Sequence, residues 1–255
     1  MELSIQDVDQ FHQRGYCVRQ GFFDRIEIKK ISDWLDSLQA SPPHSGAEAC
    51  YYEQSPLTGN SILVRVEHIL GEHNPGMTHL MLAPKVLEAL TSLFGDAPVL
   101  FKEKVNYKLP GCRSDKLHQD QAAGWNAYSN FFITMAIVVD ANRRENAALS
   151  FLSTGAYERA LMSPEWQPLT DADPPYEPAD DYQLMEADPG DVIFFDSYVP
   201  HGSPPNTSHQ PRRNIYLTFN RQSAGDQRMR YYQDKWASYP PNNLDQARGV
   251  GSYRV

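Results

Sequence analysis

The chain has 255 residues, 41% of them hydrophobic, and a formal net charge of −9. A chain of this length and composition can bury a substantial core, so we expect one domain over residues 1–255. The acidic balance argues against a broad basic surface for nucleic acid or an anionic membrane. No apolar run reaches the roughly 18 residues of a membrane span, and the polar N-terminus differs from a secretory signal.

The three cysteines, Cys17, Cys50 and Cys112, are scattered along the chain and form no CxxC pair. An odd and scattered set predicts neither a disulfide framework nor a zinc knuckle, and it is typical of a reducing compartment. We interpret each cysteine as an isolated small side chain. The expected location is therefore cytoplasmic.

Helical periodicity dominates the first part of the chain. Residues 5–16 and 24–39 are expected to form helices, and residues 76–95 are expected to form another that ends at Gly95. Residues 1–97 are therefore expected to be mainly helical and to pack against the strands that follow.

From about residue 98 the pattern changes to the alternation of β-strands. Pro, Gly and Asp separate the strand-like segments, which are VLFKEKVNYKLPG, FFITMAIVVD, ALSFLSTG, YQLMEADPGDVIFFD and RRNIYLTFNRQ. Helices followed by strands predict an antiparallel sandwich or barrel over residues 98–225, with helices on its outside. The Pro- and Asp-rich residues 163–182 form either a lid over a site or a solvated connection. The tail, residues 226–255, is expected to be irregular and to pack on the domain.

A candidate metal site begins in the segment KLHQD at 116–120. Residues i and i+2 of an extended segment point the same way, so His118 and Asp120 present an imidazole and a carboxylate on one side. His201 follows the apolar strand DVIFFD and supplies a second imidazole. Two histidines and one carboxylate form a facial triad that leaves neighbouring positions open on Fe(II), which suits 2-oxoglutarate and O2. An HxD pair alone is not specific, because many sequences contain one by chance.

Arg212 opens the strand RRNIYLTFN and is a candidate anchor for a cosubstrate. Its guanidinium can form a bidentate pair with the distal carboxylate of 2-oxoglutarate, and Arg213 is the alternative. Alternation places Arg212 on the face of Asn214 and Thr218, which we expect to be the polar barrel interior. Arg213 shares its face with apolar side chains, which we expect to fill the core between the sheets.

Several segments together resemble the phytanoyl-CoA dioxygenase family of Fe(II)/2-oxoglutarate oxygenases. They are NYKLPG (106–111), HQDQAAGW (118–125), PGDVIFFDSYVPHGSPPN (189–206), the Arg212 strand and the opening DVDQFHQRGYCVRQGFFD (7–24). The spaced combination of HxD, distal histidine and arginine is specific. The resemblance implies a mainly β fold with flanking helices, a double-stranded β-helix of the jelly-roll, cupin-like kind. It also implies a hydroxylase that uses Fe(II), 2-oxoglutarate and O2, with His118, Asp120 and His201 as the metal ligands and catalytic centre.

The resemblance implies further contacts. Asn106, Thr134 and Ser203 occupy positions that contact 2-oxoglutarate in relatives, with Thr134 near its distal carboxylate. Trp125 resembles an aromatic residue near the substrate pocket, and Gln121 in the same segment is a further substrate-binding candidate. For each residue the alternative is an ordinary strand, turn or core position that satisfies only local contacts.

The chain departs from the family in two loops. Residues 146–148 read NAA where many relatives have Asn-Gly, and residues 155–157 read GAY where many have Gly-Ser-His. Neither change removes a metal ligand, but both affect the shape of the loops and the substrate contacts near them. Asp120 itself favours hydroxylation, because halogenating relatives have a small residue at this position.

The strand FKEKVNYK carries the clearest signal about the substrate. Alternation places Lys102, Lys104, Asn106 and Lys108 on one face. If Asn106 faces the iron, Lys104 and Lys108 are substrate-binding candidates that suit a phosphonate, phosphate or carboxylate. The alternative is a solvated face at the barrel rim, and it fits Lys102 and Lys108 better than Lys104.

The chain also looks broadly like family members that act on small aminophosphonates, so the specific substrate we expect is 2-aminoethylphosphonate. An amino acid, a compatible solute or a natural-product intermediate remains open. A long acyl-CoA is less favoured, because no basic segment is dedicated to a nucleotide.

Two other classes of function remain open. One is a non-catalytic jelly-roll binding protein, and the other is a metal hydrolase that uses the same His/Asp/His site. The intact triad argues against the first, and the presence of Arg212 argues against the second, because a hydrolase has no need for it. The expected partner is a small-molecule substrate, with neither nucleic acid nor membrane, for a protein that is a monomer or a homodimer.

Overall fold

The computed structural model describes residues 3–42, 47–152, 158–162 and 182–242. Its helices are α1 Ile5–Arg14, α2 Arg25–Ala40, α3 Pro75–Met81, α4 Pro84–Phe94 and α5 Arg228–Ser238, with 3₁₀ turns η1 Asp120–Ala123, η2 Trp125–Ala127 and η3 Gln222–Ala224. Its strands are β1 Tyr16–Arg19, β2 Ala49–Gln54, β3 Ser61–Glu67, β4 Pro98–Lys108, β5 Asp115–His118, β6 Phe132–Val138, β7 Ser150–Leu152, β8 Tyr182–Leu184, β9 Val192–Asp196, β10 His201–Ser203 and β11 Arg212–Arg221.

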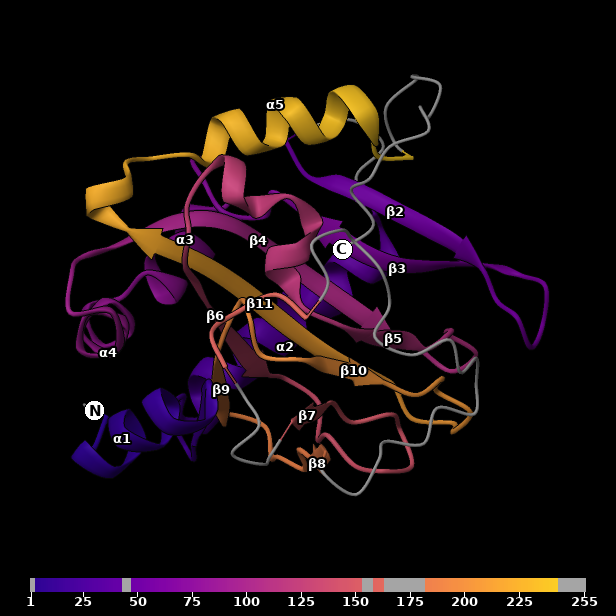
Figure 1. Ribbon diagram of the computed structural model, residues 1–255. Coiled ribbons are helices and arrows are strands. Elements are labelled where there is room, and N and C mark those ends of the chain that lie inside the picture. Colours follow the sequence, from indigo (N-terminus) through magenta and orange to yellow (C-terminus); the bar gives the residue numbers. More distant parts are fainter. Residues whose placement is uncertain (1–2, 43–46, 153–157, 163–181, 243–255) are drawn as a thin grey trace.

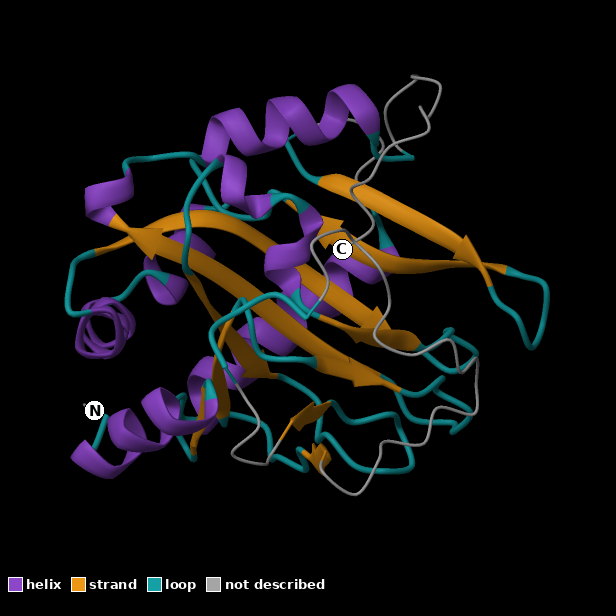
Figure 2. Ribbon diagram, in the orientation of Figure 1, coloured by secondary structure: helices purple, strands orange, loops and turns teal. Residues whose placement is uncertain are grey.

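The described strands form two antiparallel sheets (Figures 1 and 2). The larger has the order β1-β9-β6-β11-β4-β3-β2, and the smaller has the order β5-β10-β7-β8. From β4 to β11 the chain passes repeatedly between the two sheets, so consecutive strands wind around a shared interior. This topology is a jelly roll, a double-stranded β-helix with flanking helices, as the sequence predicts.

The first two helices form where their end signals predict them. Ser4 with Asp7, and Asp24 with Glu27, form capping boxes that satisfy the first backbone N–H groups of α1 and α2. Gly15 ends α1 because it adopts a left-handed conformation, with φ of 78°. Residue 16, expected to end the helix, instead begins β1.

The single helix expected at 76–95 is two helices, α3 and α4. The break lies at Ala83, which is extended, with φ of −60° and ψ of 154°. Pro84 causes it, because the proline ring disfavours a helical conformation in the preceding residue and removes a backbone donor. Proline is well tolerated at the first position of α4, so a new helix starts there.

The apolar face of β11 does not fill the space between the sheets, as expected, but packs on the outer face of the larger sheet. Ile215, Leu217 and Phe219 belong to one buried cluster with residues of α2 and α4, including Leu35 and Leu90. Burial of this face against helices leaves the interior between the sheets to polar side chains and to smaller apolar clusters. The inner face of the larger sheet is therefore available for a site.

Two parts of the sequence form elements that periodicity missed. Residues 49–67 hold β2 and β3, which extend the larger sheet beyond β4. The tail, expected to be irregular, contains α5, which lies along the β4 side of the sheet (Figure 1). Its packing on the strands is as expected, because Tyr231 and Tyr232 are fully buried. None of the described helices has the length and apolarity needed to cross a membrane.

A buried ion pair fastens α5 to β3. Lys235 Nζ lies 2.6 Å from both carboxylate oxygens of Glu67, and the two side chains are 0% and 1% exposed. Replacing Lys235 with methionine leaves the Glu67 carboxylate buried, with Arg65 as its one remaining ion-pair partner among the described residues. We expect Lys235→Met to lower the free energy of unfolding by about 3 kcal/mol.

Urea denaturation measures this change, and Lys29→Met is the control. Lys29 pairs with Asp33 on the exposed face of α2, so its replacement is expected to cost roughly 0.5 kcal/mol or less. Equal effects of the two substitutions would contradict the structural importance of the buried pair.

Candidate metal centre and cosubstrate pocket

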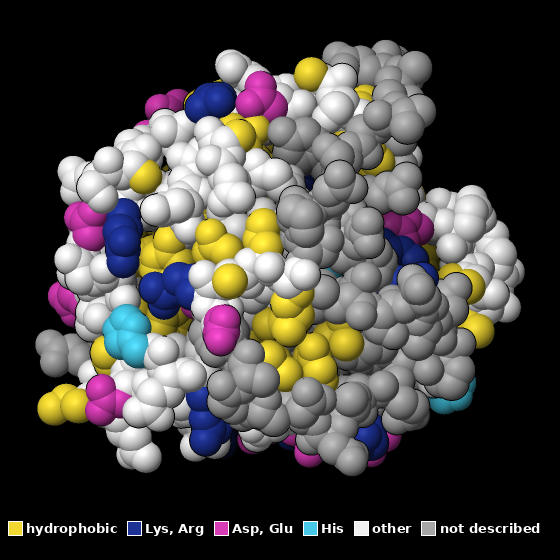
Figure 3. All heavy atoms as spheres, in the orientation of Figure 1, with side chains coloured by type: hydrophobic (Ala, Val, Ile, Leu, Met, Phe, Trp, Pro, Cys, Tyr) yellow, Lys and Arg dark blue, Asp and Glu magenta, His cyan; other side chains and the backbone are white. Residues whose placement is uncertain are grey.

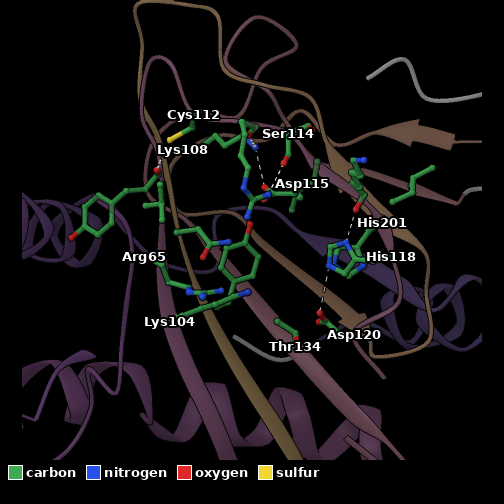
Figure 4. Close-up of a pocket in the computed structure, with 18 of the residues that line it drawn as sticks. Arg65, Lys104, Lys108, Cys112, Ser114, Asp115, His118, Asp120, Thr134 and His201 are labelled. Atoms are coloured by element: carbon green, nitrogen blue, oxygen red, sulfur yellow. Dashed lines mark hydrogen bonds and ion pairs between the residues drawn. The ribbon is translucent and has the colours of Figure 1, made fainter. Parts of the chain in front are cut away.

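The two histidines and the aspartate of the predicted triad lie together (Figure 4). His118 ends β5 and is paired directly across the ladder with His201, the first residue of β10. Asp120 opens the η1 turn, which brings its carboxylate back to 3.7 Å from His118 Nε2. One candidate ligand atom from each residue lies within 4.8 Å of the other two. This spacing allows one metal ion to contact all three.

Backbone carbonyls orient both imidazoles. His118 Nδ1 lies 2.7 Å from Lys116 O, and His201 Nδ1 lies 3.0 Å from Val199 O. A carbonyl oxygen can only accept, so each Nδ1 carries the proton and donates it. In the neutral form of each ring, Nε2 then carries the lone pair and can bind a metal, an arrangement common for metal-binding histidines.

The charge states of the site also suit a metal. Burial, with a smaller contribution from His118, lowers the pKa of His201 to about 4, so its imidazole is neutral near pH 7. Burial by itself raises the pKa of a carboxyl group, but the neighbouring His118 and His201 hold the pKa of Asp120 below its ordinary value. Two imidazoles and one carboxylate are the donor set of non-haem Fe(II) sites, so the residues fit this metal.

The triad opens into a cavity of about 840 Å³ between the two sheets. The inner face of β4 lines it with Lys102, Lys104, Asn106 and Lys108, and β6 contributes Thr134. The described residues that line the cavity do not include Arg212, Ser203, Gln121 or Trp125.

The two arginines that open β11 have different environments. Arg213 points to the helical side, where Asp140 accepts hydrogen bonds from its Nε at 2.8 Å and its Nη2 at 2.9 Å, and Asp36 pairs with its Nη1. Arg212 points to the interior and is 1% exposed. Its Nε has no hydrogen-bond partner among the described residues, and its Nη1 donates to Asn214 at 3.1 Å when the Asn214 amide is oriented with its oxygen toward Arg212. Arg212 is therefore the arginine with bonding capacity left for a ligand.

Lys108 lines the cavity beside Arg212 on the neighbouring strand, and Asp115 links it to Ser203. Lys108 is the cross-strand partner of Arg212, and it is 4% exposed, so it is not part of a solvated rim. Its Nζ and Ser203 Oγ each lie 2.9 Å from the same oxygen of Asp115. Asp115, which the sequence reasoning missed, thus already pairs with Lys108, and this argues against the predicted contact between Lys108 and substrate.

Thr134 lines the cavity far from Arg212 along the strands. It pairs with Thr218 on β11, and the two hydroxyl oxygens are 2.9 Å apart. Thr218 is separated from Arg212 by six residues of extended strand, which span about 20 Å. Thr134 and Arg212 are thus too far apart to share one carboxylate, and the expected contact of Thr134 with the distal carboxylate of 2-oxoglutarate does not fit this register.

The two predicted substrate contacts from the HQDQAAGW segment lie behind the cavity wall. Gln121 is fully buried, donates to Asn126 and to Ser129 O, and accepts from Ser197. Trp125 is 1% exposed and packs against aromatic side chains, including Phe101. These contacts give Gln121 a positioning role, because its amide already makes hydrogen bonds within the protein. They give Trp125 a packing role, because its ring already contacts other aromatic rings.

Other residues of the wall were not among the predicted contacts. Lys102 is 3% exposed and lines the cavity, so the alternative of a solvated rim does not hold for it. Thr218 and Tyr216 share the inner face of β11 with Arg212, and the same alternation could have identified them. Arg65 comes from β3, a strand that periodicity did not reveal.

The two family departures differ in what the structure shows. Asn146 accepts a hydrogen bond from Arg143 N and donates to Ala141 O, both at 2.8 Å. Ala147 has φ of 69°, a conformation that favours glycine, so the loop keeps the backbone shape of an Asn-Gly pair. Residues 153–157 and 163–181 lie outside the described residues, and the lid at 163–182 therefore stays a prediction.

A jelly roll that presents two histidines and a carboxylate to an open cavity defines the class of non-haem metal oxygenases. The family model for phytanoyl-CoA dioxygenase (PhyH) matches residues 11–214. The chain belongs to this family, and it is a 2-oxoglutarate-dependent dioxygenase. This membership decides against the hydrolase and the non-catalytic binding protein.

Individual relatives agree with the family assignment. A methylphosphonate hydroxylase of Gimesia maris is 34% identical over 237 residues, which are 93% of this chain and 88% of that protein. A 2-aminoethylphosphonate dioxygenase of an uncultured bacterium is 33% identical over 232 residues, 91% of this chain and 87% of that protein. The structure of EctD from S. alaskensis with 2-oxoglutarate and 5-hydroxyectoine shares the fold, with a TM-score of 0.67 at 20% identity, and covers 87% of this chain and 77% of that one.

Proposed function

We propose that the chain hydroxylates a C–H bond of a small phosphonate, with 2-aminoethylphosphonate as the specific candidate. The reaction consumes 2-oxoglutarate and O2 and releases succinate and CO2. The observation that carries this proposal is the cationic inner face of β4, which lines the same cavity as the His118, Asp120 and His201 triad. Two relatives at 33–34% identity are named for small phosphonates, which supports the same substrate class.

The residues divide into two roles. His118, Asp120 and His201 hold Fe(II), and Arg212 anchors the distal carboxylate of 2-oxoglutarate, with Asn106 and Ser203 as further cosubstrate contacts. Bound together, the metal and the cosubstrate supply the oxidising chemistry. The protein orients the substrate carbon toward the metal and excludes water from the buried interior.

The cavity wall favours an anion over a neutral solute. Lys104 lies on the inner face of β4, four residues from Lys108, the cross-strand partner of Arg212. Figure 4 shows Lys104 across the cavity from the two histidines. Its Nζ lies 5.4 Å from the Tyr216 ring centroid. Within the described residues it makes no hydrogen bond or ion pair, so the ammonium can bind a substrate anion.

The test is a coupled assay of purified protein with Fe(II), 2-oxoglutarate and O2. We expect 2-aminoethylphosphonate or methylphosphonate to stimulate succinate release, with an equimolar product that is one oxygen atom heavier by mass spectrometry. 3-Aminopropanoate, a carboxylate of similar length, is the control and is expected to stimulate much less. Succinate release that no phosphonate stimulates, from protein that binds iron and 2-oxoglutarate, would contradict the proposed substrate class.

The proposal includes the setting of the reaction. We place it in a reducing cytoplasm, because all three cysteines are free and buried. The enzyme acts as a monomer or homodimer on a small molecule, without nucleic acid or membrane. In support, the described acidic and basic side chains on the face in Figure 3 are interspersed and form no single basic patch.

A further inference from the structure

Lys102 is a buried cation without a hydrogen-bond acceptor. Its side chain is 3% exposed and lines the cavity, and its Nζ makes no hydrogen bond to any residue that the structure describes. The ammonium lies 4.4 Å from the ring centroid of Trp125 and 5.6 Å from that of Tyr231. These ring faces attract the charge but accept no conventional hydrogen bond from it. Burying an ammonium without a hydrogen-bond acceptor costs free energy, and a bound ligand that supplies an acceptor removes this cost.

Other cations of the cavity wall are already neutralised. Three of them pair with carboxylates, as Arg65–Glu67, Lys108–Asp115 and Arg113–Glu53. Lys102 and Lys104 make no such pair within the described parts of the chain. They lie two residues apart on one face of β4, so their charges repel each other across a buried space.

Two hydroxyl groups lie in the same cross-strand row as Lys102. Thr218 of β11 is the partner of Lys102 on one side and of Thr134 on the other, and all three residues line the cavity. The threonine oxygens are 2.9 Å apart, so one hydroxyl donates to the other. The second hydroxyl keeps its proton for another acceptor, such as an oxygen of a ligand.

The row lies on the metal side of the cavity and away from Arg212. β5 runs from Asp115, beside Lys108, toward His118, and Asp120 lies beyond it. Burial lowers the pKa of both Lys102 and Lys104, with a further lowering of Lys102 by Lys104, while the nearby Asp120 carboxylate raises both. Lys102 and Lys104 therefore form a cationic region of the cavity wall near the metal ligands, separate from Arg212, which is not among the described residues that line the cavity.

We propose that Lys102 and Lys104, with the hydroxyls of Thr134 and Thr218, bind the phosphonate group of the substrate, and that Lys102 selects the doubly charged anion. This inference rests on the proposed function. A phosphonate dianion neutralises both ammonium groups and offers three oxygens to the surrounding donors. A carboxylate carries one charge and leaves one buried ammonium without a counter-charge. Lys102 is thus a specificity-determining residue that was not among the predicted substrate contacts.

The test uses anaerobic holoenzyme loaded with Fe(II) and 2-oxoglutarate, with methylphosphonate titrated by calorimetry. Lys102→Met keeps the approximate shape of the side chain and removes an unpaired buried charge, so the variant is expected to fold. We expect it to bind methylphosphonate about 10- to 100-fold more weakly, which is the loss of one or two charge-assisted hydrogen bonds. Its affinity for 2-oxoglutarate is expected to stay within about twofold of wild type, as is that of the surface control Lys29→Met.

A second readout is the preference for 2-aminoethylphosphonate over 3-aminopropanoate, which should shrink in Lys102→Met. Wild-type protein that binds no methylphosphonate, or a Lys102→Met variant with wild-type affinity and preference, overturns the inference. Binding that depends on Lys102 without turnover of any phosphonate keeps the inference and removes the proposed function. Phosphonate turnover with equal KM in wild type and in Lys102→Met keeps the proposed function and overturns the inference about Lys102.

Discussion

His118→Ala is expected to abolish substrate hydroxylation and to remove the metal site. The side chain supplies one of three ligands, and its Nε2 has no substitute within the 4.8 Å cluster. Losing a partner that merely orients a metal ligand costs about 10- to 100-fold in affinity or activity, so loss of a ligand should cost at least 100-fold in kcat. Anaerobic titration with Fe(II) and 2-oxoglutarate measures binding through the weak visible charge-transfer band of the chelate, and succinate release measures turnover.

The control for this variant is His12→Ala, which removes an exposed imidazole from the last turn of α1. It should leave the absorption band and kcat unchanged. His118 is only partly buried, so its removal should not unfold the jelly roll, and circular dichroism checks this. A His118→Ala protein that keeps the band and wild-type turnover would refute the triad.

Arg212→Met is expected to raise the KM for 2-oxoglutarate about 10- to 100-fold. The expected loss corresponds to the one or two charge-assisted hydrogen bonds that a bidentate guanidinium makes to a carboxylate. The neighbouring Arg213→Met is a closely matched control, because it removes the same group from the opposite face of the same strand. Arg213 pairs with Asp140 and Asp36, so its removal should cost stability and leave the KM unchanged.

Succinate assays at varied 2-oxoglutarate give the KM values, and urea denaturation gives the stabilities. We expect Arg213→Met to lose about 2 kcal/mol, less than a fully buried pair, because the Asp36 side chain is 64% exposed. The reverse pattern, with the KM raised by Arg213→Met and unchanged in Arg212→Met, would transfer the cosubstrate role to Arg213.

Local rules were sufficient for the parts of the site that one strand determines. The i, i+2 relation placed His118 with Asp120, and alternation along β11 separated Arg212 from Arg213. Alternation along β4 likewise identified the face that carries the lysines. Each of these predictions needs only the period of an extended chain, which sequence shows directly.

The predictions that do not fit the structure are those that depend on how other strands and helices pack against the inner faces of β4 and β6. A solvated rim remained an alternative for Lys102 because alternation gives direction but not depth, and its burial depends on Trp125 and on Tyr231 of α5. The predicted contact of Thr134 with the distal carboxylate does not fit an anchor at Arg212, because the distance between the two residues depends on the pairing of β6 with β11. Non-local pairing of this kind has no signature in a single strand.

The opposite environments of Arg212 and Arg213 make catalytic competence depend on the alignment of β11 to within one residue. A slip by one position would turn Arg213 into the cavity and Arg212 toward the helices. Asp140 opposes such a slip, because it accepts hydrogen bonds from both the backbone N–H and the side chain of Arg213. Asp140, which lies outside the cavity, thus fixes the register of β11. Substitution of Asp140 is therefore expected to reduce activity although every metal and cosubstrate ligand is still present in the sequence.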